Sequence, residues 1–97
     1  MVELAFKAPG GLIRVTARLR AGHIDDLALS GNFTLLPASA ITNLEQGVSG
    51  LDPHRETITV RLQEIYRSAG IQSPGVTPDD LAEAILLAMD SLVKQGQ

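Results

Sequence analysis

The sequence lacks cysteine and tryptophan, and its aromatic side chains are limited to Phe6, Phe33 and Tyr66. Without cysteine the chain can form no disulfide framework, no thiol nucleophile and no thiolate metal site. With so few aromatic residues, we expect a core built from Leu, Ile, Val and Ala.

Long apolar runs and an excess of basic residues are also absent. No apolar run approaches the roughly 18 residues that a membrane-spanning helix needs, and Met1–Leu4 does not resemble a signal peptide. We therefore expect a cytoplasmic protein with no membrane partner. The formal net charge of −3 disfavours nucleic acid as a partner, because neutralising phosphates requires a basic surface. The 97 residues suit one domain, 1–97.

Apolar and polar residues alternate in three segments near the N-terminus, which is the period of half-buried strands. The segments cover residues 2–8, 13–20 and about 26–33. Pro9-Gly10-Gly11 and Ala21-Gly22-His23 separate them as turns. In the third segment the inward positions are expected to be Leu27, Leu29, Gly31 and Phe33. Ile24 and Asp25 break its phase and indicate a β-bulge.

After Pro37 the period changes to that of amphipathic helices. A short helix is expected around Ile41–Val48 and a second at about His54–Ala69, with Gly70 ending it. Thr77-Pro78-Asp79-Asp80 predicts the start of a third helix that runs to about Val93. Strands followed by helices indicate an α+β domain. We expect a three-stranded antiparallel sheet with three helices packed on one face, which leaves the other face open.

No catalytic set is recognisable, since the histidines, serines and carboxylates show no spacing that would pair a base with a nucleophile or a metal. Pro9-Gly10-Gly11 leads into a strand, so it is better explained as a hairpin turn than as a phosphate loop. Arg14, Arg18 and Arg20 share the outer face of one predicted strand. They are either solvated charges paired with Glu3 and Asp26 or a docking surface for a partner or an anion.

Three pieces of the chain, taken in order, resemble a known family. They are the lysine, turn and strand of Lys7–Val15, the segment Gly22–Phe33, and Leu44-Glu45 with Gly50 and Pro74–Leu81. Together they are similar to the C-terminal accessory domain of lipoate–protein ligases, including versions encoded as a separate small subunit. The family's Gly-Asp-Phe-Phe motif reads Gly31-Asn32-Phe33-Thr34 here, which lacks the acid and the second aromatic.

The resemblance implies a non-catalytic subunit that completes a large subunit for ATP-dependent formation of lipoyl-adenylate. The lipoyl group is then transferred to a lysine of a lipoyl carrier domain. Lipoate, ATP and Mg²⁺ are expected in the partner subunit, and none is expected to bind to this chain alone. The residues expected to face the partner or its active site are Lys7, Gly10, Gly11, Arg14, Arg18, Gly31 and Phe33.

The resemblance leaves one rival open. The chain can instead be a small homo-oligomeric binding module, unrelated to lipoate, that pairs through its sheet face or an edge strand. Sedimentation of the pure protein and mixing with a ligase subunit separate the two.

Overall fold

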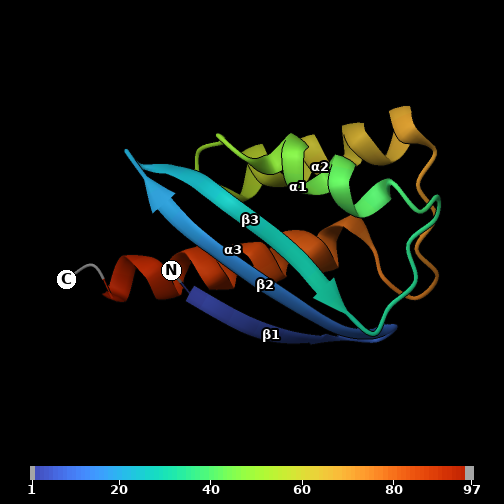
Figure 1. The fold of residues 1–97 in the computed structure, drawn as a ribbon, viewed down its shortest axis with the longest axis horizontal. Helices are drawn as coiled ribbons and strands as arrows, with labels where there is room; N and C mark the ends of the chain where they lie inside the picture. Colours follow the sequence, from blue (N-terminus) through green and yellow to red (C-terminus); the bar gives the residue numbers. More distant parts are fainter. Residues whose placement is uncertain (1, 96–97) are drawn as a thin grey trace.

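The computed structural model describes residues 2–95 and has the predicted α+β order, a three-stranded antiparallel sheet followed by three helices (Figure 1). The sheet order β1-β2-β3 follows the sequence. The strands are β1 Val2–Ala8, β2 Gly11–Arg20 and β3 His23–Gly31, and the helices are α1 Ala40–Val48, α2 Arg55–Ala69 and α3 Pro78–Gln95.

Two-residue loops join the strands. Ala21 and Gly22 connect β2 to β3 with φ of 54° and 80°, the doubly positive geometry that matches strand twist in tight hairpins. The predicted bulge is confirmed next to this hairpin. Thr16 pairs with Ala28 but Arg18 pairs with Asp25, so one residue of β2 faces two residues of β3.

The end of the third strand differs from the sequence prediction. The strand stops at Gly31, which is exposed rather than inward. Phe33 lies in the following segment, where it is half-buried against the core. The chain turns because Gly31 adopts a φ of 142° and the Asn32 N–H donates to the Leu12 carbonyl at 3.1 Å. Alternation alone cannot reveal this turn, since the apolar side chain continues the pattern.

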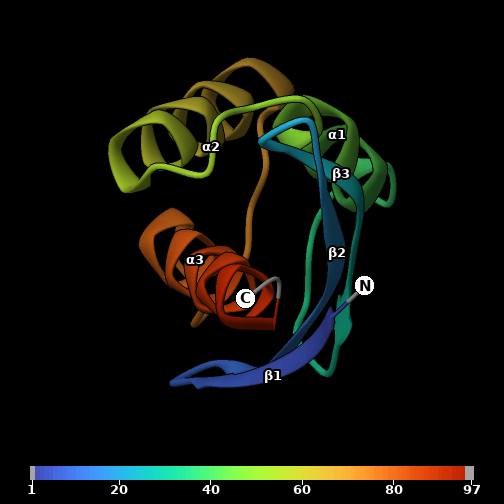
Figure 2. The same cartoon turned by 90° about the vertical axis from the view of Figure 1, so that its left-hand side faces the viewer.

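The helices cover one face of the sheet (Figure 2). α3 lies against β1 and β2, α1 lies against β3, and α2 packs on α1 and α3. The core is aliphatic, as expected, and in the described residues it contains no polar or charged side chain. Its largest fully buried side chains are Ile13, Val15, Ile24, Leu44, Val48, Ile58, Leu62, Leu81 and Ile85.

Local capping signals set the helix ends much as predicted. The Asp80 N–H donates to Thr77 Oγ1 at 3.1 Å, and the Thr77 N–H donates to Asp80 Oδ2 at 3.0 Å, which is a reciprocal capping box. Gly70 ends α2 in the left-handed conformation, with a φ of 63°. α3 continues to Gln95, slightly beyond the predicted Val93. No helix within residues 2–95 combines the length and apolar character that crossing a membrane requires.

Candidate partner-binding site

Glycines at the tip of the β1–β2 hairpin let its backbone lie close to other segments of the chain. Ala8 pairs with Gly11 around the loop Pro9-Gly10. Gly11 has a φ of 146°, and a Cβ there would lie 2.6 Å from the Asn32 carbonyl oxygen. A Cβ on Gly10 would overlap the backbone of Gly75. Both glycines are therefore needed because the backbone approaches other segments too closely for a side chain.

The segment after β3 closes against the same hairpin. A Cβ on Gly31 would overlap the Leu12 carbonyl oxygen. The Asn32 side-chain oxygen accepts a hydrogen bond from the Leu12 N–H. An aspartate oxygen at this position has the capacity to accept the same bond, so the contact does not depend on the amide.

The loop between α2 and α3 completes this end of the molecule. Leu36 and Gln72 exchange two backbone hydrogen bonds of 2.9 and 2.8 Å. The Tyr66 and Ser73 hydroxyls hydrogen bond at 2.7 Å, and the Ser73 hydroxyl also donates to the Val76 carbonyl. Burial disfavours the phenolate and raises the pKa of Tyr66 above its ordinary value of 10.0. We call the surface formed by residues 8–12, 31–36 and 71–76 the hairpin end.

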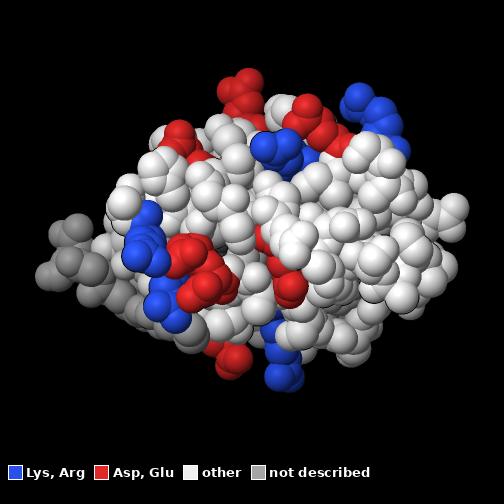
Figure 3. Space-filling model, turned by 45° about the horizontal axis from the view of Figure 1, so that its top comes forward, with Lys and Arg blue, Asp and Glu red and all other residues white. Residues whose placement is uncertain are grey.

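The hairpin end carries no charged side chain. Residues 8–13, 27–44 and 68–78 contain no Asp, Glu, Lys or Arg. Figure 3 shows the consequence: Lys, Arg, Asp and Glu gather on the left of the view and along its upper and lower margins, and a broad region on the right is nearly free of them. Leu36 is 50% exposed in this surface. The core of a protein–protein interface is depleted of charge in the same way.

Two of the predicted cations border the hairpin end. Lys7 pairs with Leu12, and Arg14 pairs with Ala5 on one side and Ser30 on the other. Both are exposed, and neither belongs to an ion pair formed within residues 2–95. Arg14 lines a hollow of about 330 Å³ together with Leu12, Ser30, Gly31 and Asn32. A guanidinium without a partner in such a hollow can receive a carboxylate or a phosphate.

Arg18 lies apart from this group. It pairs with Asp25 toward the other end of the sheet, and its guanidinium is 2.9 Å from the Asp26 carboxylate. It lies four positions after Arg14 on β2, roughly 13 Å along the strand. The structure therefore brings together six of the predicted residues and leaves Arg18 out. The six are Lys7, Gly10, Gly11, Arg14, Gly31 and Phe33.

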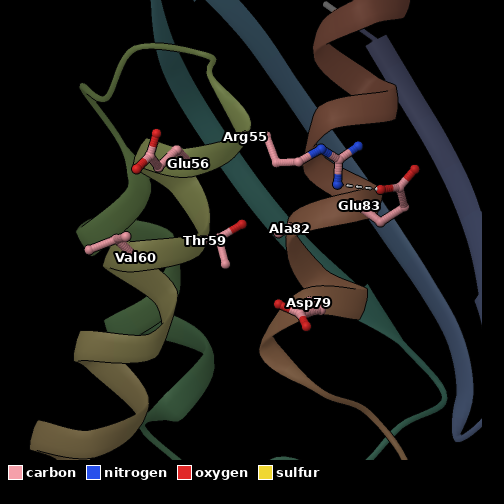
Figure 4. A pocket seen from close by; sticks show the side chains of 7 residues that line it. All are labelled: Arg55, Glu56, Thr59, Val60, Asp79, Ala82 and Glu83. Atoms are coloured by element: carbon pink, nitrogen blue, oxygen red, sulfur yellow. Dashed lines mark hydrogen bonds and ion pairs between the residues drawn. The ribbon is translucent and has the colours of Figure 1, made fainter.

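Sequence reasoning missed the contribution of the α2–α3 loop, where Gln72 and Gly75 contact segments far away in the chain. Ser73-Pro74-Gly75 is typical of a turn, but nothing in the local sequence reveals what a loop packs against. A second hollow, of about 580 Å³, lies between α2 and α3 (Figure 4). The Arg55–Glu83 ion pair of 2.8 Å links the two helices beside it. Arg55 and Glu83 therefore already neutralise each other, whereas Lys7 and Arg14 are in no ion pair formed within residues 2–95.

An uncharged end with cations at its rim has the charge distribution of a protein-binding surface. Within residues 2–95, no three His, Asp or Glu side chains lie together so as to hold a metal ion.

No protein-family model matches the chain. It is 36% identical over 85 residues to the lipoate-protein ligase A subunit 2 of Thermoplasma acidophilum, covering 88% of this chain and 87% of that protein.

Comparison with solved structures leads to the same kind of protein. It describes an archaeal lipoylation system from Thermoplasma acidophilum, a bi-partite lipoate protein ligase and its E2 lipoyl domain. One of its chains matches with a TM-score of 0.78 and 35% identity, covering 88% of this chain and 93% of that one. The chain therefore belongs to the family of lipoate–protein ligase A subunit 2, which confirms the resemblance found in the sequence.

Proposed function

We propose that this chain is the accessory subunit of a two-part lipoate–protein ligase. It completes the catalytic subunit for ATP-dependent activation of lipoate, after which the lipoyl group passes to a lysine of a lipoyl carrier protein. The observation that carries the proposal is the match over 88% of this chain and 87% of a relative that is itself the second subunit of a ligase.

The proposal assigns the chemistry to the catalytic subunit. Lipoate, ATP and Mg²⁺ bind there, and the present chain has no catalytic residue of its own. The compartment proposed is the cytoplasm. Lipoyl carrier domains meet the assembled enzyme rather than this chain alone.

The hairpin end is the surface proposed to contact the catalytic subunit. Its lack of charge and the exposed Leu36 suit burial at the centre of an interface. Lys7 and Arg14 stand at its rim, where a carboxylate of the partner or a phosphate in the shared site can reach them. The glycines at positions 10, 11, 31 and 75 hold this surface together and need no direct contact with the partner.

Reconstitution tests the proposal. The chain is mixed with a catalytic subunit that lacks its own C-terminal domain, with lipoate and MgATP present. Pyrophosphate release is expected to rise strongly when the chain is added, and no gain would refute the accessory role. A tight homodimer with no affinity for that subunit would favour a binding module unrelated to lipoate.

Single substitutions then locate the contact. Lys7→Ala and Arg14→Ala are each expected to weaken assembly or activation, because both cations border the hairpin end. Arg18→Ala is the matched control, since Arg18 lies on the same strand face but is already paired with Asp26. If Lys7→Ala and Arg14→Ala assembled and activated as the wild type does, these cations would not contact the partner.

A further inference from the structure

Within residues 2–95, other segments of the chain form hydrogen bonds with the β3 edge of the sheet but not with the β1 edge. On β3 the Leu29 N–H donates to Glu45 Oε2 of α1 at 2.8 Å. Ile24 on the same strand bonds to the backbone of Gly50 and Leu51 at 2.7 and 3.0 Å. No described segment covers the outer edge of β1, which is the outermost strand in both Figure 1 and Figure 2. An uncovered edge is a template for another strand.

The register identifies which peptide groups this edge leaves free. Leu12 directs its N–H and carbonyl toward Asn32 on the β3 side, so its neighbour Ile13 directs its own toward β1. Ile13 pairs with Phe6. The alternate residues of β1 therefore direct their N–H and carbonyl groups away from the sheet, and these residues are Glu3, Ala5 and Lys7.

We propose that β1 pairs with β1 of a second copy of this chain, antiparallel and about a two-fold axis at Ala5. In this register Glu3 of each copy lies opposite Lys7 of the other. Opposite charges that face each other across strands attract, and like charges repel. Glu3 and Lys7 are both exposed, and neither is in an ion pair formed within residues 2–95. The strand is thus complementary in charge to itself.

The inner face of the strand supports the same pairing. Leu4 and Phe6 alternate with the charged positions and are only half-buried in the single chain. In the proposed register, Leu4 of one copy lies opposite Phe6 of the other, which covers apolar surface that now contacts water. Because the β3 edge is already capped, pairing stops at a closed dimer and does not extend into a fibre.

Charge reversal tests this register with the isolated chain. Wild-type protein is expected to show a monomer–dimer equilibrium by sedimentation at concentrations up to about 1 mM, the range of weak association. Glu3→Lys and Lys7→Glu each replace two attractive contacts by two repulsive ones and should weaken dimerisation roughly tenfold or more. A 1:1 mixture of the two variants restores complementary pairs, as does the double variant Glu3→Lys/Lys7→Glu.

Arg20→Glu is the matched control, since it reverses an exposed charge on the same sheet face, at the end of the sheet away from the β1–β2 hairpin. Its dimerisation should equal that of the wild type, and thermal unfolding verifies that every variant folds. A wild-type chain that stays monomeric, reversals without effect, or a mixture that fails to re-form dimers would overturn the proposal. No catalytic subunit is present in this experiment, so its outcome is independent of the accessory function.

Discussion

The contact between Gly10 and Gly75 offers a quantitative test of how the hairpin end is held together. Gly75 has a φ of 79°, and a Cβ there would lie 2.7 Å from Gly10 Cα. The substitution Gly75→Ala therefore adds two costs. One is the left-handed backbone conformation, and the other is the overlap with the tip of the hairpin.

Gly70→Ala separates these costs. Gly70 has a φ of 63°, and a Cβ there would have no neighbour within 4 Å. The Gly70→Ala variant should therefore bear only the cost of the left-handed conformation, about 1 kcal/mol of unfolding free energy. Gly75→Ala should lose that amount and about 1–3 kcal/mol more, because Gly10 is backbone and cannot move aside as a side chain can.

Urea denaturation of the two variants and the wild type measures the difference. The midpoint for Gly75→Ala is expected to fall well below that for Gly70→Ala, with similar slopes. Gly75→Ala should also lower the affinity for the catalytic subunit more than Gly70→Ala does. If both variants were equally stable, the close approach of hairpin and loop would not be a feature of the folded protein.

Three further predictions concern single side chains. Asn32→Ala should cost about 1 kcal/mol, because the Leu12 N–H loses its acceptor. Asn32→Asp, which keeps an oxygen there, should cost less, and urea denaturation ranks them; the reverse order would contradict the acceptor role. Leu44→Ala removes a fully buried side chain and should cost about 2–5 kcal/mol by the same assay; a loss below 1 kcal/mol would place Leu44 outside the rigid core. Tyr66 has its pKa raised from 10.0, chiefly by burial. The unfolded chain thus releases this proton first, and stability should fall as pH rises from about 10 through the folded pKa. Tyr66→Phe should remove this part of the alkaline loss, and identical pH profiles for the two proteins would refute the assignment.

Most of the secondary structure could be predicted because its causes are local. Alternation predicted the strands, and Thr77-Pro78 with Asp80 predicted the start of α3, since a capping box needs only neighbouring residues. The bulge was predicted from a break in phase at Ile24. The turn at Gly31 was not predicted, because Phe33 continues the apolar alternation while the backbone has already left the strand.

The candidate site was predicted only in part. The sequence grouped Arg14 with Arg18 because alternate strand residues share a face, and it left open whether these charges pair with Glu3 and Asp26 or meet a partner. Within residues 2–95 the pairing holds for Arg18 with Asp26, but not for Arg14 or Glu3. Asp26 reaches Arg18 because the bulge repositions the start of β3. Arg14 has only Ala5 and Ser30 across the strands, so its charge remains available at the hairpin end.

By itself, the sequence determined the fold class, the aliphatic core and the resemblance to the ligase accessory domain, because periodicity, composition and motif order are properties of the chain alone. The tertiary structure decided that Gly10 meets Gly75, that an uncharged end forms around them, and that β3 is covered while β1 stays open. These features join segments far apart in the chain. Their contacts exist only once the helices pack on the sheet, and local preferences do not encode them.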